Sequence, residues 1–296
     1  MSPPLTTLDW STEGADWPNR EASRFVDAGG VRWHVQQMGQ GPVLLLLHGT
    51  GSATHTWRAL APLLAAHFTL VAPDLPGHGF TSTPPSAQLS LDGMARSVAE
   101  LLAALGLRPT VALGHSAGAA VLARMCLDRQ LDLRVLIGVN AALLPLQGLP
   151  GQVFLPAARL LSASTLIPRL FAWRAAGQAT TERLIRGTGS IIDPEGVELY
   201  ARLVRNPAHV AGALKMMANW ALDALARDLP ALPCPLALLV GTRDRTVRPA
   251  DALRVRERLS ATRIVELPGL GHLAHEERAA EVAGHVLRIA GIEKSG

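Results

Sequence analysis

The sequence predicts an α/β fold with a mostly parallel central sheet, helices on both faces and a helical cap insertion. Short apolar runs alternate with segments of helical periodicity along most of the chain. Residues 141–227 interrupt that alternation, because they are helical in composition and contain no comparable run. The alternation then resumes, so we expect a core formed by residues 1–140 and 228–296 and a cap formed by residues 141–227.

The predicted strands are short segments, most of them apolar. They cover residues 24–27, 31–37, 43–47, 68–72, 109–113, 133–139, 235–240 and 263–267. The first two alternate apolar and polar residues around a Gly-Gly turn, which predicts a β-hairpin. The run 43–47 is apolar throughout, as expected for a strand that helices cover on both faces.

The predicted helices lie between these strands, and residues 1–22 form an extended arm. They cover residues 57–67, 90–105, 117–129, 250–259 and 273–289. Ser90 begins a helix whose apolar residues fall on one side, and the last helix carries His275 and Glu276. Within the cap, six prolines are expected to interrupt the helices: Pro145, Pro150, Pro156, Pro168, Pro194 and Pro207.

The composition disfavours several classes of protein. The formal net charge of +4 is spread along the chain without a basic arm, so nucleic acid is not an expected partner. The first residues lack the basic and apolar regions of a secretory signal, and no apolar run could span a bilayer. Cys126 and Cys234 show no metal spacing, so we expect reduced thiols in a cytoplasmic protein.

A glycine-flanked serine is the strongest indication of chemistry. Ser116 stands in a Gly-His-Ser-Ala-Gly sequence, after the predicted strand 109–113 and before the predicted helix 117–129. A strand, a sharp turn and a helix form the setting in which such a serine becomes a nucleophile. The alternative is a glycine-rich turn that carries an ordinary surface serine.

Two further side chains would complete a catalytic arrangement. Asp244 follows the predicted strand 235–240, and His272 follows the predicted strand 263–267. The carboxyl ends of parallel strands meet at one edge of a sheet, so both side chains are expected near Ser116. We predict Ser116 as nucleophile, His272 as general base and then acid, and Asp244 as the carboxylate that orients the imidazole. The alternatives are a turn role for Asp244 and a helix-capping role for His272.

The oxyanion of a tetrahedral intermediate needs N–H donors that are already in place. The backbone of Ala117, at the start of the helix after the serine, is one expected donor. Thr50, in the loop after the run 43–47, is the other, with Gly49 as the alternative.

Other polar residues near these motifs are assigned structural roles. His48 is expected to shape the oxyanion loop, Asp74 and His78 to stabilise their turn, and His115 to line the pocket. The remaining histidines show no metal-ligand spacing, so neither a metal nor a cofactor is predicted.

Together these motifs resemble the α/β-hydrolase superfamily over about residues 24–290. They are His48 to Gly51, Asp74 to Gly79, the serine motif, Gly241 to Asp244 and Gly271-His272. The chain order Ser, Asp, His also matches that superfamily. The resemblance implies an α/β-hydrolase fold and a serine hydrolase of the carboxylic-ester type. A haloalkane dehalogenase would carry Asp in place of Ser116, so that activity is disfavoured.

A narrower resemblance covers almost the whole chain. Segments 17–20, 33–36, 48–58, 73–81 and 114–120 are similar to the BchO family, the magnesium-chelatase accessory proteins of bacteriochlorophyll biosynthesis. The resemblance implies a role near magnesium insertion into protoporphyrin IX, with magnesium-chelatase subunits as partners. The apolar, arginine-rich insertion would also suit peripheral contact with the photosynthetic membrane. The chain lacks the Gly-x-x-x-x-Gly-Lys loop of an ATP-binding chelatase subunit.

Two functions remain open at this point. One is a serine hydrolase acting on an ester or related carbonyl bond of a small molecule, such as a tetrapyrrole or lipid. The other is a non-catalytic carrier or scaffold that holds a porphyrin for the chelatase. The cap is apolar and rich in arginine, which suits a macrocycle that bears carboxylates. These arginines are Arg159, Arg169, Arg174, Arg183, Arg186, Arg202 and Arg205. The alternative is that the apolar faces pack on the core and the arginines are solvated.

Overall fold

The computed structural model describes residues 5–145, 166–174 and 177–292. Its core is an eight-stranded sheet of strand order β1-β2-β4-β3-β5-β6-β7-β8. The strands are β1 (Ser23–Ala28), β2 (Val31–Met38), β3 (Val43–Leu47), β4 (Thr69–Pro73), β5 (Val111–His115), β6 (Val135–Val139), β7 (Leu236–Gly241) and β8 (Arg263–Leu267). β1 and β2 form the predicted hairpin, β2 pairs antiparallel with β4, and the remaining neighbours pair in parallel. The predicted mostly parallel sheet is confirmed.

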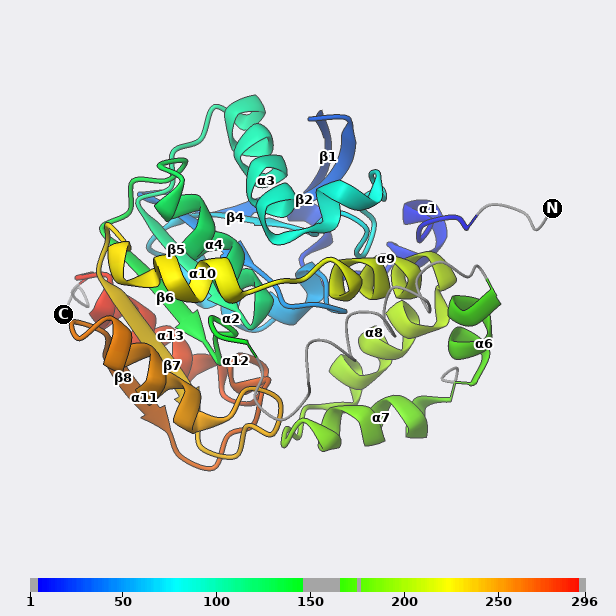
Figure 1. Ribbon diagram of the computed structural model, residues 1–296. Coiled ribbons are helices and arrows are strands. Elements are labelled where there is room, and N and C mark those ends of the chain that lie inside the picture. The colour runs from blue at the N-terminus through cyan, green and yellow to red at the C-terminus, as the bar shows by residue number, and fades with distance from the viewer. Residues whose placement is uncertain (1–4, 146–165, 175–176, 293–296) are drawn as a thin grey trace.

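Helices cover both faces of this sheet (Figure 1). They are α2 (Leu60–Ala65), α3 (Leu91–Leu105), α4 (Ala117–Leu127), α11 (Pro249–Arg258), α12 (Ala274–Glu277) and α13 (Ala279–Ile289). Leu45 and Leu47 of β3 belong to the apolar cluster that contains α3 and α4, whereas Leu44 and Leu46 belong to the cluster that contains α2 and α13. Alternate residues of one run therefore face two different cores, which explains why the run has no polar position.

Two of the predicted helices are shorter than expected. The segment 57–67 begins in the 3-10 turn η2 (Thr54–Trp57), and only α2 is α-helical. The segment 273–289 is broken at Arg278, whose φ of −142° and ψ of 67° are not helical. The break separates α12 from α13, so His275 and Glu276 lie on the short helix α12, where both are buried, rather than on the final helix.

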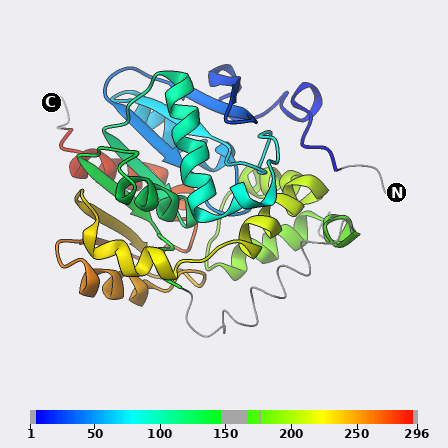
Figure 2. The same ribbon diagram turned by 45° about the horizontal axis from the view of Figure 1, so that its top comes forward.

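Between β6 and β7, the described residues form helices and no strand. The helices are α6 (Leu166–Arg174), α7 (Gln178–Gly187), α8 (Pro194–Arg205), α9 (Pro207–Ala218) and α10 (Asp223–Asp228). Figures 1 and 2 show α6 to α9 gathered at one end of the sheet, while α10 returns beside α4. None of the described helices combines the length and apolar character that crossing a bilayer requires.

Two of the prolines in this region begin helices instead of interrupting them. Pro194 and Pro207 occupy the first positions of α8 and α9, where the N–H group that proline lacks has no helical partner. Asp193 and Asn206 cap these helices with their side chains. The expectation of interrupted helices is therefore wrong at these two positions, while Pro150 and Pro156 lie outside the described residues.

The N-terminal arm packs between the core and the helices α8 and α9. It contains the short helix α1 (Trp10–Glu13), so it is not wholly extended as expected. Trp17 is buried in one cluster with Phe80 of the core and Leu203 of α8. The arm also contacts α8 through an ion pair of 2.7 Å between Arg202 and Asp16. The arm therefore joins the two parts of the molecule.

Candidate active site

Ser116 lies at the sharp turn between β5 and α4. Its backbone has a φ of 50° and a ψ of −118°, a conformation that non-glycine residues rarely adopt. The neighbouring glycines allow this turn, because a Cβ on Gly114 would overlap the backbone of Ala119 and a Cβ on Gly118 would overlap the Leu47 carbonyl. Strand, turn and helix thus hold a strained serine at the carboxyl end of a central strand.

His272 and Asp244 are in direct contact. His272 Nδ1 lies 2.7 Å from Asp244 Oδ2, and the aspartate side chain is fully buried. The other oxygen, Oδ1, accepts hydrogen bonds from the backbone N–H groups of Thr246 at 2.7 Å and Val247 at 3.0 Å. A carboxylate oxygen accepts the hydrogen bond, so Nδ1 of His272 is the donor and Nε2 is the acceptor nitrogen of the ring.

Ser116 and His272 line the same cavity, which has a volume of about 180 Å³. The loop after β3 contributes Gly49, Thr50 and Ser52 to this cavity. Helices α7 and α8 form its opposite wall, chiefly with Thr181, Leu184, Ile185, Tyr200 and Val204. Side chains from distant parts of the sequence, including Ser116, Thr50 and His272, therefore line one cavity.

The expected oxyanion donors lie beside this serine. Ala117 begins α4, and the first N–H groups of a helix have no partner within it. Across the described residues, the backbone N–H groups of Thr50 and Ala117 make no hydrogen bond to the protein. A Cβ on Gly49 would be only 3.0 Å from Ser116 Cβ, so the loop of Thr50 passes directly over the serine.

Comparison with known proteins agrees with the observed fold. A model of the alpha/beta hydrolase family matches residues 44–285. The chain belongs to the alpha/beta hydrolase family. An alpha/beta hydrolase fold protein from Burkholderia ambifaria has a similar structure, with a TM-score of 0.76 and 22% identity, covering 96% of this chain and 100% of that one. The predicted fold is thereby confirmed.

Two curated relatives extend over most of this chain. It is 37% identical to the magnesium-chelatase 30 kDa subunit of Rhodobacter capsulatus, over 92% of this chain and 96% of the relative. It is 30% identical to a pimeloyl-[acyl-carrier protein] methyl ester esterase of Methylococcus capsulatus, over 84% of this chain and 95% of the relative. The relatives of this chain thus include both an esterase and a protein named for a chelatase.

The structural roles expected for the polar residues around the candidate site agree with their contacts. The Leu75 N–H donates to His48 Nε2 at 2.8 Å, so His48 Nδ1–H donates to the Gly49 carbonyl, also at 2.8 Å. Burial lowers the pKa of His48, which keeps the imidazole neutral. His78 lies 3.1 Å from the Pro76 carbonyl. His48 therefore links the oxyanion loop to the neighbouring turn.

Asp74 holds its turn with a fully buried carboxylate. It accepts hydrogen bonds from the N–H groups of Thr54 at 2.6 Å and Phe80 at 3.0 Å, and it lies 2.8 Å from His34 Nδ1. Burial alone would raise the pKa of Asp74, but the contact with His34 and the backbone donors hold that pKa well below its usual value.

Asn140 has a positioning role that we did not predict from the sequence. Its Nδ2 donates to the carbonyls of Gly271 at 2.9 Å and His272 at 2.8 Å, and its Oδ1 accepts from the Gly241 N–H at 2.8 Å. The side chain therefore ties the loop of His272 to the end of β7, from which Asp244 follows. Asn140 comes directly after the apolar run of β6. A polar residue that follows a buried strand is also the sequence feature that indicated Asp244.

Some arginines of the predicted cap form ion pairs within the chain. Three of its arginines contact carboxylates: Arg186 with Glu182, Arg202 with Asp16 and Arg205 with Glu198. Arg159 and the side chain of Arg174 lie outside the described residues. At those three positions the partners of the guanidinium groups are carboxylates of the chain itself, and binding of a macrocycle there stays a prediction.

Proposed function

We propose that this alpha/beta hydrolase is a serine hydrolase that cleaves an ester or a related carbonyl bond. The observation that carries the proposal is the 2.7 Å contact with Asp244 of the same His272 that lines a cavity together with Ser116. Ser116 Oγ would attack the carbonyl carbon while His272 Nε2 accepts its proton and passes it to the leaving alcohol. The N–H groups of Thr50 and Ala117 would stabilise the oxyanion, and water would then release the acid.

The size of the cavity supports a small acyl or alkyl group as the part of the substrate that enters. Its volume of about 180 Å³ is below the roughly 300–1,000 Å³ of most ligand sites. Leu184, Ile185 and Leu273 make its walls apolar. With α7 and α8 forming a wall of this cavity, a tetrapyrrole substrate would insert only an ester-bearing side arm.

A fluorophosphonate probe tests the proposed nucleophile. We expect the purified protein to be labelled and the Ser116→Ala variant to remain unlabelled. Ser97→Ala is the matched control, because Ser97 is a buried serine within α3, and its labelling should equal that of the wild type. Labelling of Ser116→Ala, or no labelling of the wild type, would contradict the serine hydrolase proposal.

The resemblance to a magnesium-chelatase subunit supports a place in bacteriochlorophyll biosynthesis, and it also favours a second candidate function. In that alternative, the protein binds a porphyrin or the chelatase without catalysis. A strain that carries only Ser116→Ala separates the two: accumulation of one esterified tetrapyrrole supports the hydrolase, and normal pigment supports the scaffold. Co-purification of chelatase subunits or membrane lipid with the protein would test those proposed contacts.

A further inference from the structure

The cap contacts three successive residues of the oxyanion loop, which is the segment 49–52 after β3. Each contact joins a loop residue to a side chain of α8 or α9: Thr50 Oγ1 with Met216 Sδ at 3.5 Å, the Gly51 carbonyl with His209 Nε2 at 3.2 Å, and Ser52 Oγ with the Tyr200 hydroxyl at 3.2 Å. The loop that carries a proposed oxyanion donor is thus held from the cap side along its length.

The direction of the His209 hydrogen bonds follows from its neighbours. The N–H of Gly79 donates to His209 Nδ1 at 3.0 Å, so the ring proton is on Nε2 and is donated to the Gly51 carbonyl. Burial lowers the pKa of His209 to about 4, so the imidazole is neutral and keeps both bonds at neutral pH. Helix α9 thereby connects the oxyanion loop to the turn after β4.

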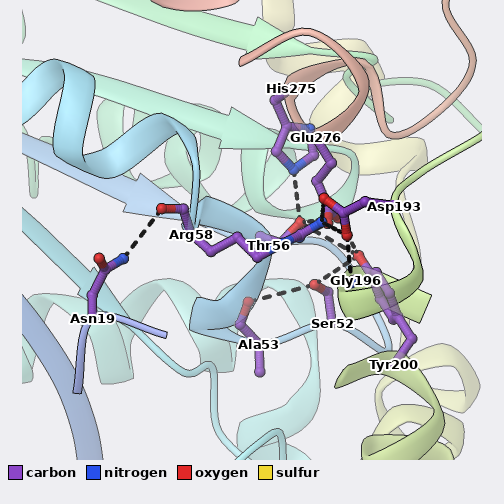
Figure 3. Close-up of polar contacts among 10 residues, drawn as sticks. All are labelled: Asn19, Ser52, Ala53, Thr56, Arg58, Asp193, Gly196, Tyr200, His275 and Glu276. Carbon is purple, nitrogen blue, oxygen red and sulfur yellow. Dashed lines mark hydrogen bonds and ion pairs between the residues drawn. The ribbon is translucent and has the colours of Figure 1, made fainter. Parts of the chain in front are cut away.

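Tyr200 connects the oxyanion loop to a different segment. Its hydroxyl donates to Glu276 Oε1 at 2.8 Å and is therefore free to accept the proton of Ser52 Oγ (Figure 3). Glu276 is buried and lies four positions after His272 in the sequence. A single hydroxyl of α8 thus joins the loop of Thr50 to the segment that begins with His272.

The same buried carboxylate also anchors the start of α8. Arg58 pairs with Glu276 Oε2, and its other guanidinium nitrogen contacts Asp193 at 2.9 and 3.0 Å (Figure 3). Asp193 is the residue that caps α8, through a 2.6 Å bond from the N–H of Gly196. Helix α8 is therefore fixed to the core at its N-cap residue, Asp193, and again at Tyr200. These two contacts define its position over the cavity.

We infer that Tyr200 is a positioning residue for the oxyanion hole. Through Ser52 its hydroxyl holds the loop so that the Thr50 N–H faces the cavity. Through Glu276 the same hydroxyl fixes the position of that loop relative to His272. The catalytic consequence rests on the proposed hydrolase function, whereas the restraint on the loop does not. The cap is then part of the catalytic geometry, because the donor is in place only while α8 is docked.

A double-mutant cycle tests this inference with p-nitrophenyl acetate as the substrate. Tyr200→Phe removes the hydroxyl but keeps the ring against His55, whose centroid is 4.5 Å away. We expect Tyr200→Phe and Ser52→Ala each to lower kcat by about 10- to 100-fold, because a displaced donor no longer meets the oxyanion. KM should stay within about twofold, since the apolar walls are unchanged. The double variant should be no slower than the slower single variant.

Thr110→Val is the matched control, because it removes a hydroxyl that is buried without a partner at the opposite end of β5. It should have wild-type kcat and KM. Independent, multiplying effects of Tyr200→Phe and Ser52→Ala, or a wild-type kcat in Tyr200→Phe, would overturn the inference.

Amide hydrogen exchange gives a readout that does not require activity. Residues 49–52 should exchange faster in Tyr200→Phe than in the wild type, while the residues of β3 should exchange at the wild-type rate. If the wild type lacks esterase activity, the proposed function fails and this measurement alone decides the inference. Unchanged exchange at residues 49–52 in Tyr200→Phe would contradict it.

Discussion

The three hydrogen bonds of Asp244 decide which nitrogen of His272 can act as a base. Two backbone N–H groups, from Thr246 and Val247, hold one carboxylate oxygen, and the other oxygen is left to the imidazole. The pairing matters because a neutral imidazole has one donor and one acceptor nitrogen, and only the acceptor can take the serine proton. A single substitution can reverse this choice without changing the shape of the site.

Asp244→Asn should lower kcat for ester hydrolysis by about 10³- to 10⁴-fold. The amide would donate to His272 Nδ1, so the ring proton would move to Nε2 and the base would be lost. Steady-state kinetics measure the effect, and Asp132→Asn, at an exposed aspartate, is the control. A loss of less than tenfold in Asp244→Asn would mean that the carboxylate does not orient the base.

Tyr200 is the only tyrosine of the chain, so tyrosinate absorbance reports its ionisation directly. Burial first, and then the nearby carboxylate of Glu276, raise the pKa of this phenol well above its ordinary value. We expect no tyrosinate signal at the pH where a free phenol ionises, about 10. In Glu276→Gln the repulsion is gone, so the signal should appear at lower pH than in the wild type. The same titration curve in both proteins would argue against the contact.

The close approach of helix α4 to strand β3 explains why Ser116 can stand on so sharp a turn. Gly118 lies in the first turn of α4, directly against the carbonyls of Leu47 and His48. The helix can approach the strand this closely because residue 118 has no side chain. This is a property of the packed pair of elements, because neither element alone requires glycine there.

Gly118→Ala should lower the free energy of unfolding by at least about 1–3 kcal/mol, because the added methyl group overlaps backbone that cannot move aside easily. Gly187→Ala is the contrasting variant, since a Cβ at this helical glycine meets nothing within 4 Å. It should instead stabilise the protein by up to about 1 kcal/mol. Urea denaturation measures both, and equal effects of the two changes would contradict the packing argument.

The molecule as a whole buries an unusual number of histidines. Eight of its ten histidines are buried, and six of these have a pKa that burial lowers: His48, His55, His78, His115, His209 and His275. The folded protein keeps them neutral, whereas the unfolded chain takes up protons near pH 6.5. Stability should therefore be greatest above that pH and fall as the solution becomes acidic.

His209 allows this acid sensitivity to be measured at one position. Its folded pKa of about 4 means that its contribution is complete above pH 6.5 and is lost progressively between pH 6.5 and 4. At pH 5 the loss from this residue should be about 2 kcal/mol. We expect His209→Gln to be less stable than the wild type at pH 7.5 but to lose less stability on acidification. Parallel stability curves from urea denaturation at pH 7.5, 6 and 5 would contradict the expectation.

The sequence by itself determined the strands, the turn at Ser116 and the order of the three candidate catalytic residues. These features depend on neighbouring residues, because an apolar run such as Val43–Leu47 and a glycine-flanked turn have short-range physical causes. The same reasoning correctly anticipated that Asp244 and His272 would meet, since parallel strands end at one edge of the sheet.

Only the tertiary structure decided which side chains hold that edge in place. The contact of Ser52 with Tyr200, the three bonds of Asn140 and the ion pair of Arg202 with Asp16 all join residues far apart in the sequence, which no periodic pattern relates. Such contacts depend on how α8 docks and on where the chain breaks its last helix at Arg278. Those outcomes follow from packing in three dimensions, where many weak contacts compete and no local pattern decides the result.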